Sequence, residues 1–279
     1  MISDQIKIKD ISKDMIEDLA GLCIPEEMED DPYFIEGVFL WKKWIIENLE
    51  RFGSIGKVAY LDSQIAGMIQ YVPKCEDKIV EIKCSFVEKD KKGFGIRKSL
   101  LDETIDEFKR PKTYFGDESA KALVALTCHS SLNLDNIDFY KDNGFKRLSS
   151  ETEYLLYFSL DEDYTASVTS SEMNDDYIDD FEKDKAVIFC NSHCPYCVDE
   201  MMDIFTELRK LDSDIPVRLV IPFEEPEEFD RVFSMPLSVV INGRALGYSM
   251  LDNEVFLDDM KETLVCESGK GTFSSDPSL

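Results

Sequence analysis

Two cysteines in the C-terminal half of the chain are spaced for thiol chemistry. Cys194 and Cys197 form a Cys-Pro-Tyr-Cys motif between an apolar run at 186–190 and a helical pattern at 195–211. The unpaired N–H groups at a helix N-terminus favour the Cys194 thiolate, and Cys197 can close a disulfide after Cys194 attacks. The spacing also suits zinc, but no second cysteine pair or spaced histidine pair completes four ligands. We therefore predict thiol chemistry and no metal.

A glycine-bearing loop in the N-terminal half is suited to bind a phosphate. The segment Lys91-Lys92-Gly93-Phe94-Gly95-Ile96-Arg97 lies between a strand-like run ending at Val87 and a helical pattern starting near Phe94. Glycines let backbone N–H groups converge on an anion, and the first helical turn adds the positive end of its dipole. The pattern predicts a phosphate or pyrophosphate site, although an ordinary glycine-bearing loop has the same composition.

A second motif follows the next apolar strand pattern. In the segment 133–145, Asn133, Asn136, Tyr140 and Gly144-Phe145 are spaced as Asn-x-x-Asn-x-x-x-Tyr-x-x-x-Gly-Phe. This segment resembles the Asn-x-x-Ala-x-x-x-Tyr-x-x-x-Gly-Phe segment of the GCN5-related N-acetyltransferase (GNAT) superfamily. The upstream loop resembles the Gln/Arg-x-x-Gly-x-Gly/Ala acetyl-CoA motif of that superfamily, with Asp90 in place of its Gln or Arg. Two motifs in the right order are more specific than either alone.

The resemblance covers about residues 1–160 and implies an N-acetyltransferase with acetyl-CoA as cosubstrate. It implies that Tyr140 protonates the departing CoA thiolate, because a phenol with an ordinary pKa of about 10 stays protonated at neutral pH. The alternative for Tyr140 is a helix-face aromatic that packs on Phe145. The base is not identified; Glu81, Glu88 and His129 lie near the expected cleft. The cofactor-binding residues that the resemblance implies are Phe86, Val87, Gly93, Phe94, Gly95, Ile96, Arg97 and Asn133.

A proline stands about 40 residues after the Cys-Pro-Tyr-Cys motif. Pro236 opens a strand-like run that ends in the hairpin turn Asn242-Gly243. Together these features resemble the glutaredoxin branch of the thioredoxin-like fold. The resemblance implies that Cys194 is the nucleophile, Cys197 the resolving thiol and Pro236 the substrate-positioning residue. The whole arrangement looks similar to acetyltransferases with a YoaP-type C-terminal domain.

Hydrophobic periodicity predicts the elements that position these motifs. A mixed α/β (α+β) chain is expected, with a GNAT fold followed by a small thioredoxin-like domain. Trp41 and Trp44 either line a pocket or belong to the core, and their helical spacing with Ile45 favours the core. Strands are expected at 6–8, 58–61, 65–72, 79–87, 122–127, 153–159, 186–190, 217–221, 237–241 and 245–249. Helices are expected at 12–19, 33–49, 94–108, 134–142, 195–211, 225–233 and 255–264.

Composition along the chain predicts its organisation. Residues 161–183 carry nine acidic residues and one basic residue with little apolar periodicity, as expected of a linker. We expect an acetyltransferase domain at 1–160, this linker at 161–183, a glutaredoxin-like domain at 184–266 and a disordered tail at 267–279.

Charge and hydropathy disfavour several classes of function. The 279 residues include 31 Lys+Arg and 58 Asp+Glu, and the net charge of −27 opposes binding to nucleic acids and acidic membranes. No apolar run approaches the roughly 18–20 residues that span a bilayer, and the N-terminus lacks the apolar core of a signal peptide. Eight cysteines are too sparse for a disulfide scaffold. We therefore expect a cytoplasmic protein.

Three functions fit these observations. The leading hypothesis is an N-acetyltransferase that acts on a small-molecule or peptide amine, with a thiol domain that binds or regulates the substrate and has a possible thiol or disulfide partner. The second is a thiol-disulfide oxidoreductase whose first domain only binds acyl-CoA. The third is a non-catalytic module that responds to acyl-CoA. Tyr140 favours the first over the third, and Asp90 argues the other way.

Overall fold

The computed structural model describes residues 6–23, 26–127, 137–147, 155–162, 164, 184–190, 192–221, 239–246 and 253–268. The chain divides into two compact units. Unit 1 comprises Met1–Val168 and Ser192–Cys197, and unit 2 comprises Thr169–Asn191 and Val198–Leu279. The Cys-Pro-Tyr-Cys loop therefore belongs to unit 1. In the part of the chain that the structure describes, no helix is long and apolar enough to cross a membrane.

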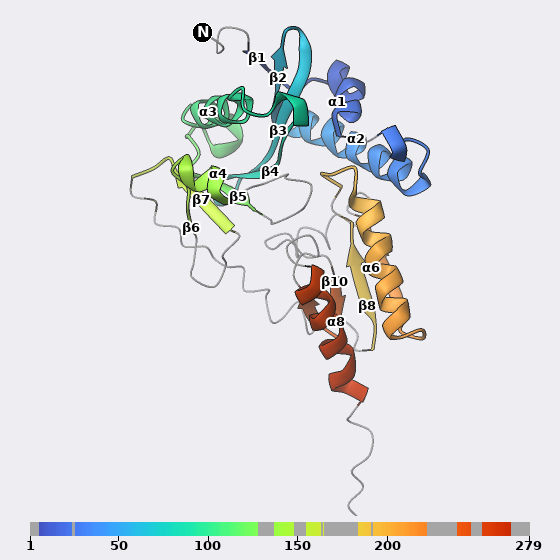
Figure 1. Ribbon diagram of the computed structural model, residues 1–279. Coiled ribbons are helices and arrows are strands. Elements are labelled where there is room, and N and C mark those ends of the chain that lie inside the picture. Colours follow the sequence, from blue (N-terminus) through green and yellow to red (C-terminus); the bar gives the residue numbers. More distant parts are fainter. Residues whose placement is uncertain are drawn as a thin grey trace, which may run out of the picture. The chain divides into compact units, whose positions relative to one another are not determined.

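Unit 1 is built on a sheet with the strand order β1-β2-β3-β4-β5-β7-β6 (Figure 1). β4 and β5 pair in parallel, and the other neighbours pair antiparallel. The strands are β1 (Ile6–Asp10), β2 (Gly56–Leu61), β3 (Gln64–Lys74), β4 (Ile79–Val87), β5 (Ala122–Leu126), β6 (Lys146–Arg147) and β7 (Leu155–Ser159). The mixed α/β class and the six strands expected in this half are confirmed, whereas β6 was not expected.

Local capping defines both ends of the long helix α2 in unit 1. The Asp31 carboxylate accepts hydrogen bonds from the N–H groups of Tyr33 and Phe34, and Gly53 ends the same helix with a φ of 77°. Ser12 makes no such cap and instead donates its hydroxyl to Asp14. The elements are η2 (Lys13–Met15), α1 (Ile16–Cys23), η3 (Glu26–Met28), α2 (Pro32–Phe52), η4 (Lys89–Lys91), α3 (Ile96–Phe108), η5 (Thr113–Phe115) and α4 (Ile137–Asp142).

A β-bulge in β4 decides which of its side chains face each side of the sheet. The β3–β4 register shifts so that Gln70 pairs with Cys84 and Tyr71 with Ile82, which leaves Lys83 as the extra residue. Ile82 is buried in the core that α3 helps to form, whereas Cys84 lines a pocket outside that core. Because one extra residue reverses the alternation, the bulge turns the end of β4 toward that pocket.

An ion cluster around the buried Lys57 side chain fixes the C-terminal part of α3 to the sheet. The Lys57 ammonium lies 2.6 Å from Asp10 and 2.5 Å from Glu107, and Tyr71 donates its hydroxyl to Glu107 at 3.1 Å. Burial opposes the charge on Lys57, but its hydrogen bonds to the two carboxylates outweigh burial and raise the pKa of Lys57. The cluster therefore holds α3 in place, and the N-terminus of this helix follows the glycine loop.

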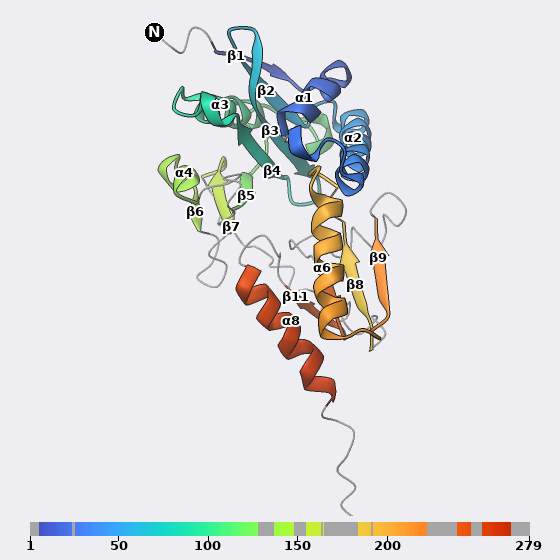
Figure 2. The same cartoon turned by 45° about the vertical axis from the view of Figure 1, so that its right-hand side comes forward.

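Unit 2 contains a smaller sheet with the order β11-β10-β8-β9. β8 and β9 are parallel, and β10 is antiparallel to both β8 and β11. Figure 2 shows α8 beside β11 within this unit. The elements are β8 (Ala186–Phe189), α6 (Cys197–Leu211), β9 (Val217–Val220), β10 (Val239–Ile241), β11 (Arg244–Leu246) and α8 (Asn253–Ser268).

The hairpin between β10 and β11 confirms the expected Asn-Gly turn. Asn242 and Gly243 have φ values of 51° and 78°, as a type I′ turn requires. Three expected features fall outside the described residues. The helix at 225–233 and Pro236 lie wholly outside them, and the tail at 267–279 does so from residue 269 onward. Most of the expected linker does too.

Candidate active site

The glycine loop joins β4 to α3 in the way that its sequence predicts. Gly93 and Gly95 have φ values of 89° and 80°, in the left-handed region that favours glycine. Gly95 is the N-cap of α3, so the helix begins at Ile96 rather than near Phe94. A Cβ added at either glycine meets nothing within 4 Å. The loop therefore presents backbone N–H groups and a helix N-terminus to open space, as an anion site requires.

The charged side chains of this loop pair mainly with one another. Asp90 lies 3.0 Å from Lys91, whose hydrogen bond lowers the pKa of Asp90. Lys98 pairs with Asp102 at 2.8 Å. The carboxylate of Asp90, which stands at the Gln/Arg position of the GNAT motif, is thus partly neutralised by Lys91.

Arg97 does not point to the open side of the loop. Its Nε donates to the Ser85 hydroxyl at 3.2 Å, and its guanidinium lies 4.1 Å from the ring centre of Phe139. The side chain therefore connects α3 to β4 and α4. Only the backbone of Arg97 fits the predicted role in holding a phosphate.

The end of β4 extends beyond its pairing with β5. The parallel register runs from Ile79–Ala122 to Ile82–Ala125, while β4 continues to Val87. Ser85, Phe86 and Val87 therefore lie beyond this parallel register. Such a strand end can pair with an extended amide-bearing chain. Phe86 and Val87, predicted as cofactor contacts, lie in this segment.

Tyr140 is a fully buried residue of α4. Its ring centre lies 5.0 Å from that of Phe145 and 5.2 Å from that of Phe139. Tyr140 is therefore packed against aromatic rings, as the alternative interpretation of the sequence expected. Its role as a proton donor stays a prediction. Asn133 and His129 lie outside the described residues.

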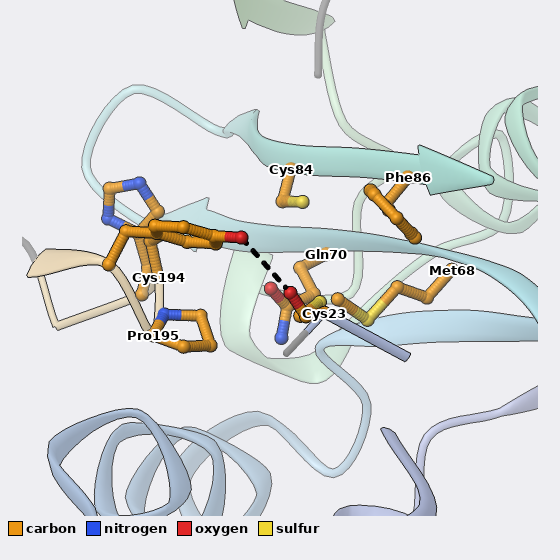
Figure 3. Close-up of a pocket in the computed structure, with 9 residues that line it drawn as sticks. Cys23, Met68, Gln70, Cys84, Phe86, Cys194 and Pro195 are labelled. Carbon is orange, nitrogen blue, oxygen red and sulfur yellow. Dashed lines mark hydrogen bonds between the residues drawn. The ribbon is translucent and has the colours of Figure 1, made fainter. Parts of the chain in front are cut away.

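A pocket lies on the face of the sheet toward which the bulge turns the end of β4 (Figure 3). Its cavity volume is about 50 Å³. One wall comes from β3 and β4, and another comes from the Cys-Pro-Tyr-Cys loop. The lining residues are Cys23, Met68, Gln70, Cys84, Phe86, His193, Cys194, Pro195 and Tyr196.

The Cys-Pro-Tyr-Cys loop is fixed by contacts with α1 and α2. The Tyr196 hydroxyl donates to the Cys23 carbonyl at 3.3 Å, and the Tyr196 ring meets Phe34 edge to face at 4.5 Å. A Cβ at Gly37 would lie 2.0 Å from the Pro195 carbonyl oxygen. Glycine in the middle of α2 therefore permits a close backbone approach, which explains why this helix tolerates it.

Trp41 and Trp44 are both buried, which confirms their predicted place in the core. The Trp41 indole donates to Gln70 Oε1 at 3.5 Å. Gln70 itself is 0% exposed, and its Nε2 has no hydrogen-bond partner among the described residues. A buried donor without an acceptor costs about 1–3 kcal/mol. Gln70 was not among the predicted site residues, although a glutamine within an apolar strand was a possible signal.

Charge beside the pocket is concentrated at Glu81 and Lys83, whose charged groups lie 2.6 Å apart. Burial opposes ionisation of Glu81, but Lys83 and Lys74 outweigh it and lower its pKa. Burial and the nearby Lys83 lower the pKa of His193 to about 3. His193 is therefore neutral at neutral pH, whereas Glu81 is an anion and a weak base.

The predicted thiols lie where their order in the motif suggests. Cys194 is partly buried and lines the pocket, and Cys197 is buried at the start of α6. The structure thus brings Cys194 together with Phe86, two residues that the sequence assigned to separate sites. Besides Gln70, the pocket residues Cys23, Met68 and Cys84 were not among the predicted site residues. No group of three metal-binding side chains occurs in the described ranges.

Comparison with known proteins shows what this architecture resembles. No curated protein matches the chain. Three similar solved structures are the PaiA N-acetyltransferase of Thermoplasma acidophilum with coenzyme A, YhbS of Escherichia coli with CoA, and a GNAT acetyltransferase of Brucella melitensis with acetyl-CoA. Their sequence identities are 15%, 19% and 14%, and their TM-scores are 0.41, 0.38 and 0.40. They cover 55%, 57% and 57% of this chain and 98%, 83% and 91% of their own. The model of the acetyltransferase (GNAT) family matches residues 14–145.

Proposed function

We propose that the chain is an N-acetyltransferase that transfers an acetyl group from acetyl-CoA to an amine of a small molecule or peptide. The observation that carries the proposal is the junction of β4 and α3. There a strand end that extends beyond its register with β5, two left-handed glycines and a helix N-terminus follow one another along the chain. This order suits a ligand with an extended amide chain and a pyrophosphate.

The proposed cofactor site uses backbone groups more than side chains. Amides of residues 93–97 would hold the pyrophosphate, and the backbone of Phe86 and Val87 would hold the pantetheine chain, with Asn133 on its other side. Open space at Gly93 and Gly95 supports this assignment, because a bulky group can approach both glycines.

In the proposed reaction, the acceptor nitrogen attacks the thioester carbon and the carbon–sulfur bond breaks. The CoA thiolate then takes the phenolic proton of Tyr140. The acceptor pocket is the cavity lined by Phe86, which belongs to the same strand end. A cytoplasmic location, suggested by the sequence, would provide acetyl-CoA.

Two measurements test this function. Calorimetry with acetyl-CoA measures binding, and a CoA-release assay with a panel of amines measures transfer under reducing and oxidising conditions. Binding and amine-dependent release are expected. A protein that binds no acetyl-CoA is not an acetyltransferase.

A second candidate function is thiol-disulfide exchange by the thioredoxin-like domain that the sequence suggests at 184–266. The sheet order β11-β10-β8-β9, with β8 and β9 parallel, supports this candidate, as does the Cys-Pro-Tyr-Cys motif before α6. Cys194 would be the nucleophile, Cys197 the resolving thiol and Pro236 the positioning residue. Limited alkylation followed by peptide mass spectrometry tests it: Cys194 is expected to label faster than Cys197, and mild oxidant is expected to join them.

A further inference from the structure

The pocket of Figure 3 brings together two kinds of chemistry. Cys194 of the Cys-Pro-Tyr-Cys motif lines it together with Phe86, which belongs to the strand end proposed to hold the acyl thioester. We propose that the acceptor is an aminothiol, whose sulfur Cys194 holds as a mixed disulfide while its amino group is acylated. This inference rests on the proposed acetyltransferase function and adds the class of substrate.

The size and lining of the pocket fit such a molecule. A bound water needs about 10–15 Å³ of cavity volume, so the observed volume of about 50 Å³ has room for roughly four non-hydrogen atoms. A thiol, two methylene groups and an amine have this size. The sulfur-containing side chains of Cys23, Met68 and Cys84 provide a polarisable lining for a methylene–sulfur group.

The polar groups of the pocket indicate where the rest of the ligand lies. Gln70 Nε2 is a buried donor that lines the pocket and has no acceptor among the described residues. A carbonyl or carboxylate oxygen on the ligand would accept from it; in a ligand as large as cysteine, the atoms beyond the roughly four that the cavity holds would extend out of it. His193 is neutral at neutral pH, so the lining residues present no cation to repel an amine.

Cys194 is the pocket thiol best suited to capture a sulfur. It precedes the N-terminus of α6, where the positive end of the helix dipole favours a thiolate. Burial raises the pKa of Cys23 and keeps that thiol protonated. Cys84 lies on a strand and has no helix N-terminus beside it in sequence.

The steps balance as thiol-disulfide exchange followed by acyl transfer. The Cys194 thiolate attacks a disulfide of the aminothiol, one sulfur–sulfur bond forms and one breaks, and one aminothiol leaves as a thiolate. The amine of the captured half attacks acetyl-CoA, and CoA leaves as a thiolate that takes up a proton. Cys197 then attacks Cys194, which releases the N-acetyl thiol and leaves a 194–197 disulfide. A dithiol reductant returns both cysteines to thiols.

Two disulfides that differ in one atom type test the proposal in the unmodified chain. Cystamine carries an amine on each half, and hydroxyethyl disulfide carries a hydroxyl in its place. Intact-mass and peptide mass spectrometry should show that both form an adduct on Cys194. On addition of acetyl-CoA, only the cystamine adduct should gain an acetyl group and release CoA.

Variants locate the chemistry. Cys194→Ser should lose the adduct and slow single-turnover acylation of the amine by on the order of 10²-fold, because the tether that orients it is gone. Cys75→Ser, a cysteine that does not line the pocket, should keep both. Gln70→Leu should weaken capture of cystine, which has carboxylates, more than capture of cystamine.

Three outcomes overturn the inference. They are an adduct on another cysteine, an adduct that acetyl-CoA never acylates, and acylation of the cystamine amine by the Cys194→Ser variant at the rate of the unmodified chain. If acetyl-CoA binds and acylates other amines, only the inference fails. If calorimetry shows no acetyl-CoA binding, the proposed function fails with it.

Discussion

The loop before α3 and the loop before α6 both place reactive groups just ahead of a helix N-terminus, yet their surroundings are opposite. At Gly95 an added Cβ meets only open space, and the nearby Asp90 and Lys91 are charged. At the second loop, Tyr196 and Pro195 pack against α1 and α2, and His193 is kept neutral by burial. An open, charged loop suits a large hydrated anion, and an enclosed, uncharged loop suits a small neutral sulfur group.

The difference also explains why glycine serves the two regions differently. Gly95 is needed for its left-handed backbone, with φ at 80°. Gly37 is needed for its missing side chain, because a Cβ would lie 2.0 Å from the Pro195 carbonyl oxygen. Substitution at each position therefore tests one of the two loops.

The largest effect is expected at Tyr140, beside the first loop. Tyr140→Phe keeps the ring packed on Phe139 and Phe145 but removes the proposed acid. Turnover should fall by roughly 10²–10⁴ while acetyl-CoA affinity stays similar. Steady-state kinetics and calorimetry measure the two quantities. Tyr157→Phe on β7 is the control, and a Tyr140→Phe enzyme with full turnover would assign the residue to packing alone.

Gly95→Glu tests the open loop. The new carboxylate repels the pyrophosphate, and the left-handed backbone strains any other residue by about 1–3 kcal/mol, so acetyl-CoA affinity should fall at least about 30-fold. Gly116→Glu is a matched control, because Gly116 has a φ of 73° and equally open surroundings but follows η5. Equal affinity for the two variants in calorimetry would remove the glycine loop from the cofactor site.

Gly37→Ala tests the enclosed loop. The added methyl group forces Pro195 away, and overpacking of this kind costs about 1–3 kcal/mol. Gly21→Ala in α1 is the control: nothing lies within 4 Å of its Cβ, so it should be neutral or stabilise by about 0.5–1 kcal/mol. Urea unfolding followed by tryptophan fluorescence reports on unit 1, since both tryptophans of the chain are in α2. Equal stabilities would mean that the loop does not pack on α2 in solution.

The pH dependence of the same fluorescence transition tests His193. The unfolded chain binds a proton at an ordinary pKa of about 6.5, and the folded chain at about 3. Between these values the unfolded state holds more protons, so stability falls as pH decreases by at most about 1.4 kcal/mol per pH unit. His193→Gln should reduce this slope between pH 7 and pH 5. An unchanged slope would show that His193 is solvated and not enclosed.

The sequence alone determined the features that local physics controls. The strand at 79–87 has the predicted bounds. Its alternating apolar residues and the charged residues that follow it are signals within one short segment, so the sequence alone was sufficient. The Asn242-Gly243 turn and the left-handed glycines before α3 follow from backbone preferences of single residues. The two motifs that resemble the GNAT superfamily lie within or next to residues 14–145, which the model of that family also matches.

Only the tertiary structure decided how β4 is divided between two faces and what the Cys-Pro-Tyr-Cys loop contacts. The bulge at Lys83 depends on register with β3, and no alternation within β4 reveals it. The hydrogen bond from Tyr196 to Cys23 joins residues 173 apart in sequence. Such contacts depend on how surfaces that are distant in sequence fit together. Hydrophobic periodicity describes only residues that are close along the chain, so it could not predict that Cys194 and Phe86 line one pocket.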